Sequence, residues 1–128
     1  NIRRENILRP NEIVVELVVP QPEPNSKGIY LKVRERDSID FALVSLAAQV
    51  TVQNGICQRS SLVFGVVAPV PWLAIEAEHY LRGREITESR AENAAEAAVE
   101  DAKPMPDNSY KVKIAKNLVK QALLALAS

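Results

Sequence analysis

The sequence predicts an α+β fold in which an antiparallel sheet of three to four strands is covered on one face by three C-terminal helices. Two β-type runs, residues 42–52 and 56–68, are joined by Asn54 and Gly55. This pair favours the type I′ turn of a β-hairpin, which needs positive φ at both central residues. After the hairpin the apolar spacing changes to the 3.6-residue period of helices. Strands followed by helices, without alternation of the two, argue against a βαβ nucleotide-binding fold.

Further strand signals lie before the hairpin. Residues 13–19 are β-branched residues or leucine apart from one glutamate, and Pro20 closes the run, so we expect a first strand there. Residues 21–28 contain two more prolines and are expected to form a loop. Residues 30–36 alternate apolar and polar side chains, which fits either a short edge strand or an irregular connection.

The first two helices differ in their apolar faces. Pro71 suits the first turn of a helix and Gly83 suits its end, so we expect a helix between them. Its shared face combines residues of mixed polarity: Trp72, Ile75, Glu76, His79 and Tyr80. Ser89 and Glu92 predict a capping box for a second helix, which ends at residues 103–104. The apolar positions of this helix are almost all alanine, which allows close packing against a neighbouring helix.

A third helix is expected after Asp107, Asn108 and Ser109, each of which can cap a helix N-terminus. It carries a long apolar stripe: Ala115, Leu118, Val119, Ala122, Leu123 and Leu126. The stripe predicts burial along the whole helix. The second helix is acidic and the third is basic. The charges form either two surfaces that orient partner subunits or two solvated helix faces, and we favour the solvated faces.

Length and composition fit one domain, 1–128, with a lead-in at 1–11, the sheet at 12–68 and the helices at 71–126. Hydrophobic residues make up 47% of the chain and charged residues 25%, as in ordinary globular proteins. The formal net charge is +0, so nothing favours nucleic acid as a partner. No membrane span or signal peptide is visible, and we expect a cytoplasmic protein. The chain lacks an initial Met, and we expect that it was cut from something longer.

A single cysteine and a single histidine leave few options for chemistry. Cys57 is expected to be a small buried hydrophobe in a strand. One thiolate cannot form an internal disulfide or a multi-thiolate metal site, so we expect no metal in this chain. His79 is expected to be a packed or half-exposed structural residue. Since no nucleophile–base pair is visible, we expect no catalytic residue.

The candidate binding residues lie between the proline-rich loop and the hairpin. Tyr30 and Lys32 follow a loop with proline and glycine, where side chains are exposed and often functional. The alternative is a surface tyrosine beside solvated charges. Arg36 belongs to a mixed-charge run, residues 34–40, for which weak ion pairs of roughly 0–1 kcal/mol are a sufficient explanation.

Several short segments follow one another in an order that resembles a known family. They are residues 8–13, 30–36, 39–47, 63–72, 77–83, 106–111 and 118–120. The residues that carry the resemblance include Tyr30, Lys32 and Arg36. The family is the C-terminal domain of the molybdenum hydroxylase flavoproteins, the FAD-binding subunits of carbon monoxide dehydrogenases, xanthine dehydrogenases and their bacterial relatives.

The resemblance implies a supporting, non-catalytic role within an oxidoreductase. In that family electrons pass from a molybdenum centre through iron–sulfur clusters to FAD and then to an acceptor. This domain would cover the flavin and dock to the iron–sulfur and molybdopterin subunits. Tyr30 and Lys32 would lie near the flavin ring, with Arg36 as a third candidate. A tyrosine ring can shield a flavin, and a lysine can stabilise negative charge on it.

The resemblance does not imply that this chain binds FAD alone. The family holds the flavin pyrophosphate in glycine-rich loops of the preceding domains, and none of the four glycines here belongs to such a loop. We expect FAD to bind only together with the preceding FAD-binding domain. The alternative function is a free-standing α+β protein–protein interaction module without flavin. A polypeptide of about 250–300 residues with upstream glycine-rich loops would favour the flavoprotein.

Overall fold

Within the described residues, the sheet consists of three long antiparallel strands and two short ones. The computed structural model describes residues 6–37 and 39–127, so the predicted lead-in at 1–11 lies partly outside the described residues. The long strands are β1 (Ser26–Val33), β2 (Val44–Gln53) and β3 (Ile56–Gly65). The short strands, β4 (Trp72–Leu73) and β5 (Arg84–Glu85), pair with opposite ends of β3.

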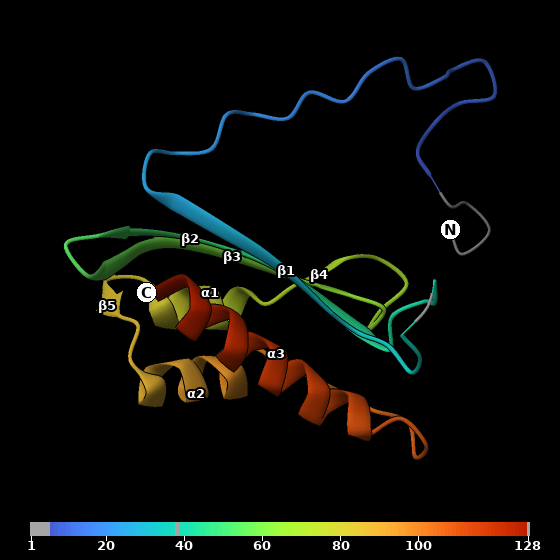
Figure 1. Ribbon diagram of the computed structural model, residues 1–128. Coiled ribbons are helices and arrows are strands. Elements are labelled where there is room, and N and C mark those ends of the chain that lie inside the picture. Colours follow the sequence, from blue (N-terminus) through green and yellow to red (C-terminus); the bar gives the residue numbers. More distant parts are fainter. Residues whose placement is uncertain (1–5, 38, 128) are drawn as a thin grey trace.

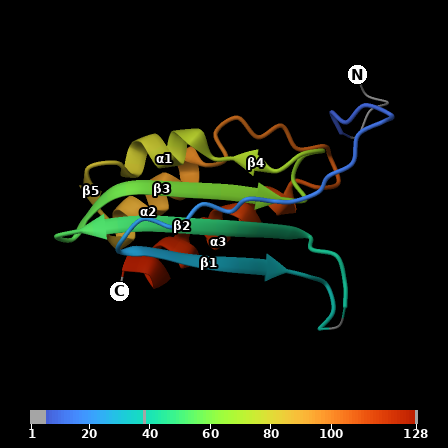
Figure 2. The same ribbon diagram turned by 90° about the horizontal axis from the view of Figure 1, so that it is seen from above.

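The helices of the described chain lie together on one face of the sheet (Figures 1 and 2). They are α1 (Ile75–Leu81), α2 (Glu88–Ala97) and α3 (Tyr110–Ala127). α1 contacts β3, and α3 contacts β1 and β2. The predicted fold class, an antiparallel sheet with three helices on one face, is confirmed. In this part of the chain, none of the helices has the length and apolar character needed to cross a bilayer.

The hairpin turn forms where the sequence predicts it. Asn54 and Gly55 have φ angles of 52° and 77°, as a type I′ turn requires. β3 ends at Gly65 rather than at the predicted residue 68. The next residue, Val66, has a φ of 65°, so the backbone leaves the extended conformation there.

The core lies between the helices and the sheet. Alternate residues of β2 point into it and are buried: Val44, Leu46, Ala48 and Val50. All six residues of the apolar stripe predicted on α3 are buried as well. On α2 the buried residues are Ala91, Ala94 and Ala95, whose small side chains allow α2 to pack against both α1 and α3.

Residues 13–19 do not form the predicted first strand. They belong to no helix or strand of the described chain, and Figure 1 shows this segment running apart from the sheet. A strand is stabilised by hydrogen bonds and packing against a neighbouring strand, and none of the strands described here pairs with this segment. The β propensity of these residues is therefore not sufficient to form a strand here.

The chain around Trp72 is extended rather than helical. The prediction that Pro71 lies in a first helical turn is wrong, because α1 begins at Ile75. Trp72 instead pairs with Phe64 as part of β4. The edge of β3 offers hydrogen-bond partners to this backbone, and that pairing prevails over the helical spacing of the side chains.

The face predicted for the first helix is also wrong, although its end is confirmed. The buried residues of α1 are Ala77 and Leu81, whereas His79 is exposed. Gly83 follows the helix with a φ of 74°, the conformation expected of a residue just past a helix end. Its N–H donates to the carbonyl of Cys57 at 2.8 Å, so the end of α1 is tied to β3.

α2 begins and ends earlier than predicted. Thr87 is its N-cap, and the Oγ1 atom of Thr87 accepts a hydrogen bond from the Arg90 N–H at 3.3 Å. The predicted capping box of Ser89 and Glu92 is therefore wrong. Ile86, which directly precedes Thr87, is buried, and both threonine and serine are good caps. After α2 the chain continues in turns instead of remaining helical to residues 103–104.

The acidic charges of α2 and the basic charges of α3 face each other. Lys116 Nζ lies 2.5 Å from a carboxylate oxygen of Glu96. Lys120 Nζ lies 2.7 Å from Glu92 and 3.0 Å from Glu88. These bonds to Glu92 and Glu88 raise the pKa of Lys120. Several of the charged side chains predicted on the two helices thus form ion pairs within the domain. The sequence had suggested either solvated helix faces or surfaces that orient partner subunits, and neither interpretation included such pairs.

Candidate functional site

β1 carries two of the predicted binding residues on the face of the sheet that the helices leave open. Tyr30 and Lys32 alternate with residues that pack against the core: Ile29, Leu31 and Val33. Successive side chains of a strand point to opposite faces, so Tyr30 and Lys32 point away from the helices. The Tyr30 side chain is 63% exposed. Figure 1 shows no helix on this side of the sheet.

Short side chains surround Tyr30 and Lys32 on this open face. On β2, Ala47 lies opposite Tyr30 and Ser45 lies opposite Lys32. Gly65 of β3 pairs with Ser45 on the other side, and a Cβ atom at Gly65 would come within 2.4 Å of the Ser45 Oγ. A larger residue at Gly65 would therefore displace Ser45. Ser45 is buried in this packing, whereas Ala47 beside Tyr30 is exposed.

Asp40 brings Lys32 and Arg36 together. The Lys32 Nζ donates to the backbone carbonyl of Asp40 at 2.5 Å. The Arg36 Nε lies 3.4 Å from the Asp40 Oδ2, and the other carboxylate oxygen accepts from the Phe41 N–H at 2.9 Å. Asp40 was not among the residues predicted for the site. In the sequence it belongs to a mixed-charge run, for which weak ion pairs were a sufficient explanation. Its position between two cations and a backbone donor depends on loop geometry.

The connection between β1 and β2 exposes two large apolar side chains. Ile39 and Phe41 flank Asp40, and both are almost fully exposed. The Leu43 N–H donates to the Val33 carbonyl at 2.8 Å and closes this connection at its base. Burying an apolar side chain of this size is more favourable than leaving it exposed by about 1.5–3 kcal/mol of free energy. These two side chains therefore favour contact with another surface, next to Lys32.

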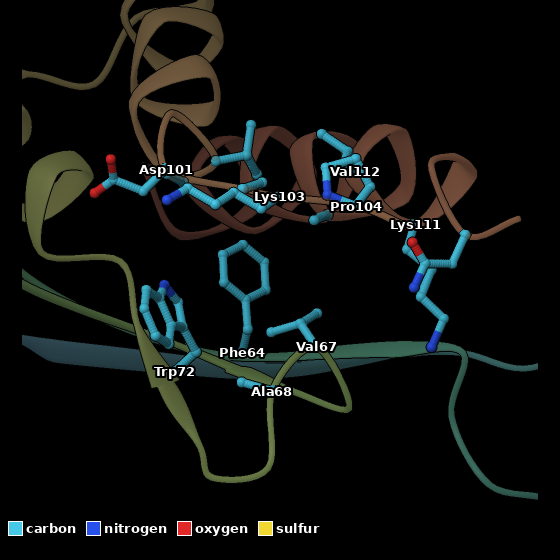
Figure 3. Close-up of a pocket in the computed structure, with 14 residues that line it drawn as sticks. Phe64, Val67, Ala68, Trp72, Asp101, Lys103, Pro104, Lys111 and Val112 are labelled. Carbon is cyan, nitrogen blue, oxygen red and sulfur yellow. The ribbon is translucent and has the colours of Figure 1, made fainter. Parts of the chain in front are cut away.

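A separate cavity of about 260 Å³ lies on the helix side of the sheet (Figure 3). Phe64 and Trp72 line it from the sheet, and Lys103, Pro104 and Val112 line it from the segment between α2 and α3 and from α3. None of the predicted site residues lines this cavity. The cavity and the open face with Tyr30 and Lys32 are therefore on different sides of the sheet.

The two residues considered for nucleophilic or metal chemistry do not form a site. Cys57 is buried as predicted, and burial raises the pKa of its thiol, which keeps it protonated and unreactive. His79 is exposed on α1. The described residues contain no group of three or more His, Cys, Asp or Glu side chains that could hold a metal ion.

Comparison with known proteins gives consistent matches to one family. The sequence profile of the CO dehydrogenase flavoprotein C-terminal domain matches residues 29–126. The chain is also similar to the aldehyde oxidoreductase FAD-binding subunit PaoB of Escherichia coli (strain K12), with 31% identity over 119 residues. That match covers 93% of this chain and 34% of PaoB, so the chain spans about a third of the length of this relative.

Solved structures of related enzymes share the fold. Quinoline 2-oxidoreductase from Pseudomonas putida 86 superimposes with a TM-score of 0.74 and 31% identity, over 83% of this chain and 38% of that chain. Carbon monoxide dehydrogenase from Hydrogenophaga pseudoflava, in a form lacking the Mo-pyranopterin moiety, gives a TM-score of 0.77 and 28% identity. This match covers 84% of our chain and 39% of that chain. The resemblance inferred from the sequence is confirmed: this chain belongs to the family of CO dehydrogenase flavoprotein C-terminal domains.

Proposed function

We propose that this domain covers the flavin of an FAD-binding subunit, with Tyr30 and Lys32 facing the isoalloxazine ring. The observation that carries the proposal is the helix-free face of the sheet (Figure 1). There an exposed Tyr30 lies among short side chains, and Lys32 is held at the adjoining end of the strand. PaoB is an FAD-binding subunit, which supports FAD as the cofactor in this family.

The shape of this face fits a flavin as one wall of its site. Tyr30 is exposed, and the short side chain of Ala47 opposite it leaves room for a planar ring to approach. The same face is open, and it does not enclose a ligand. We infer that the remaining contacts come from the part of the subunit that this domain does not supply, and PaoB extends well beyond the matched region. This agrees with the absence of a glycine-rich loop from the sequence.

Each residue of the face has a distinct task in this proposal. A bound flavin supplies the capacity to accept and release electrons. The ring of Tyr30 offers an apolar surface that excludes water from one side of the cofactor. The ammonium group of Lys32 supplies a positive charge that stabilises negative charge on the ring, and the Asp40 carbonyl holds that group in place. Arg36 acts as a positioning residue through its ion pair with Asp40.

The wider role follows the same family. We propose that the flavin receives electrons from molybdenum and iron–sulfur centres of partner subunits and passes them to an acceptor. The exposed side chains of Ile39 and Phe41, next to Lys32, would dock against another part of this assembly. The domain itself makes no covalent bond to substrate in this proposal, and we assign it no catalytic residue.

The test is an FAD titration followed by flavin fluorescence on the full-length FAD subunit. Tyr30→Ala and Lys32→Ala should each raise the Kd for FAD by roughly 5- to 30-fold, which corresponds to about 1–2 kcal/mol of lost contact. Matched controls are Tyr110→Ala and Lys113→Ala, which change the same residue types on α3 on the other side of the sheet. These controls should leave the Kd unchanged.

Two results would count against the proposal. If Tyr30→Ala and Lys32→Ala bind FAD as tightly as the controls do, the open face does not contact the cofactor. If the full-length subunit binds no FAD at all, the alternative of an α+β protein–protein interaction module without flavin would replace it. The exposed Ile39 and Phe41 would then be the first residues to test for partner binding.

A further inference from the structure

The cavity on the helix side of the sheet has walls from three separate parts of the chain. Phe64 and Trp72 line it from the sheet, Val67 lines it from the loop after β3, and Pro104 lines it from the segment between α2 and α3 (Figure 3). Phe64 is buried, whereas Trp72 is 48% exposed and Val67 is 40% exposed. The cavity therefore extends from a buried aromatic ring to side chains at the surface of the domain.

The size and lining of the cavity fit a compound with one or two rings. An apolar cavity of about 150 Å³ holds benzene, and this cavity measures about 260 Å³. Ligand sites in proteins are mostly apolar, with a few polar groups that fix the orientation of the ligand. Phe64 and Trp72 provide two aromatic side chains here, and aromatic rings pack favourably against one another. The lining therefore favours an aromatic ring over an aliphatic chain.

One asparagine in the lining has a buried hydrogen-bond acceptor without a donor. The Oδ1 atom of Asn108 is buried, and none of the described residues donates a hydrogen bond to it. Leaving a buried acceptor unpaired is unfavourable, and most such atoms in native proteins have a partner from the protein or from bound molecules. Asn108 therefore favours a ligand that carries an O–H or N–H group.

The charged side chains that line the cavity favour an acidic ligand. They are Lys103, Lys111 and Asp101, so two cations and one anion leave one net positive charge. Lys111 Nζ lies 3.4 Å from the Val66 carbonyl. Figure 3 shows Lys103 and Asp101 with their charged groups at the opposite end of the cavity from that of Lys111. Lys103 would attract an acidic group at this end, and Asp101 would weaken the attraction.

We propose that this cavity is a binding site for a small aromatic acid that carries a hydroxyl group. The aromatic ring packs against Phe64 and Trp72. The hydroxyl group donates to the Oδ1 atom of Asn108, and the carboxylate lies toward Lys103. The site is on the helix side of the sheet, away from the open face, so this inference does not depend on binding of a flavin.

Fluorescence titration of the intact chain with 4-hydroxyphenylacetate tests the proposal. Trp72 is the only tryptophan of the sequence, so tryptophan emission reports on the cavity. Binding should change this emission with a Kd of about 1 mM or below, as expected for a ligand of this size. Ala102→Phe, which fills the cavity from an exposed position, should raise the Kd at least about tenfold. Ala125→Phe, at an exposed position near the C-terminal end of α3, is the matched control and should leave the Kd unchanged.

Combinations of ligand and variant test each polar contact separately. Asn108→Ala should raise the Kd of 4-hydroxyphenylacetate roughly 3- to 10-fold and leave that of phenylacetate, which lacks the hydroxyl group, unchanged. Lys103→Ala should raise the Kd of both acids roughly 2- to 5-fold, whereas Asp101→Asn should lower it about twofold. Neither change should affect the Kd of 4-cresol, which lacks the carboxylate. Lys113→Ala, at an exposed position of α3 outside the cavity, is the control for the loss of a positive charge.

Three outcomes would overturn the proposal. Unchanged emission of Trp72 at about 10 mM 4-hydroxyphenylacetate, well above the expected Kd, would show that the cavity does not take such a ligand. Equal Kd values for Ala102→Phe and Ala125→Phe would place the bound ligand outside the cavity. Equal losses of affinity for 4-hydroxyphenylacetate and phenylacetate in Asn108→Ala would show that Asn108 supports the structure of the loop and does not bind the hydroxyl group.

Discussion

Val66 shows how one residue can determine where a strand ends. A β-branched side chain at a φ of 65° is unfavourable, because the left-handed region places Cβ too close to the following carbonyl oxygen. The Val66 carbonyl accepts a hydrogen bond from Lys111 Nζ at 3.4 Å, which links this strained residue to α3. Val66 directly follows β3, and its conformation directs the chain toward Trp72.

Replacing Val66 by asparagine should stabilise the domain. Asparagine tolerates positive φ, and the strain at a β-branched residue is about 1–2 kcal/mol, so Val66→Asn should raise the free energy of unfolding by about 1 kcal/mol. Urea denaturation measures this change. Val70→Asn is the matched control, since Val70 is similarly exposed without a positive φ, and it should have little effect. A Val66→Asn variant that is less stable than the parent would show that the strain is compensated elsewhere.

The predicted site also depends on single residues whose position the sequence does not reveal. The residue types of Tyr30, Lys32 and Arg36 pointed to an exposed surface, and the strand confirms the exposure of Tyr30. Asp40 could not be singled out, because a carboxylate in a mixed-charge run looks like a solvated residue. Its backbone carbonyl, rather than its side chain, binds Lys32, and no sequence pattern encodes such a contact.

At the scale of elements, α1 completes the edge of β3. β4 ends at Leu73, so the edge of β3 opposite β2 has no strand partner for the next stretch of its backbone. The Leu62 carbonyl there accepts from the Ala74 N–H at 2.9 Å. The Leu62 N–H donates to a carboxylate oxygen of Glu78 at 2.8 Å. A side chain on the helix thus replaces the missing strand.

Removing this carboxylate should destabilise the domain. Glu78→Ala leaves the Leu62 N–H without its partner beside a fully buried side chain, and we expect a loss of about 1–3 kcal/mol in the free energy of unfolding. Glu78→Gln keeps an acceptor oxygen and should lose less. Glu76→Ala, on the exposed side of the same helix, is the control and should be nearly neutral. Chemical denaturation compares the four proteins, and equal stability of the alanine variants would refute this role of Glu78.

At the scale of the whole molecule, the sheet has one closed face and one open face. The helices bury the inner face, whereas Tyr30 on the outer face and Ile39 and Phe41 at its end remain exposed. Residues 13–19 add a further exposed apolar surface that lies outside the core. Further exposed apolar side chains lie around β4 and the start of α1: Val70, Trp72, Leu73 and Ile75.

Deleting residues 1–20 should leave the stability of the domain nearly unchanged. Residues 13–19 are largely exposed and contribute nothing to the buried core, so the free energy of unfolding should change by less than about 0.5 kcal/mol. Solubility should increase, because an exposed apolar segment is removed. Deleting residues 122–128 is the contrasting control, since it removes Ala122, Leu123 and Leu126 from the core and should prevent folding. A large loss of stability on deletion of residues 1–20 would show that the segment supports the sheet.

The sequence by itself determined the elements that depend on neighbouring residues. The turn at Asn54 and Gly55 follows from the φ preferences of two adjacent residues, and the burial of α3 follows from the spacing of apolar side chains along one helix. The order of short segments also identified the family that the comparison confirmed.

Only the tertiary structure decided the elements that need a distant partner. Trp72 is extended because β3 offers it a strand edge, whereas residues 13–19 form no strand because none of the described strands pairs with them. Ion pairs such as that of Lys120 with Glu92 form because α2 and α3 pack side by side. A strand or an ion pair requires two segments that are far apart in the sequence, and a local pattern contains information about one of them at a time.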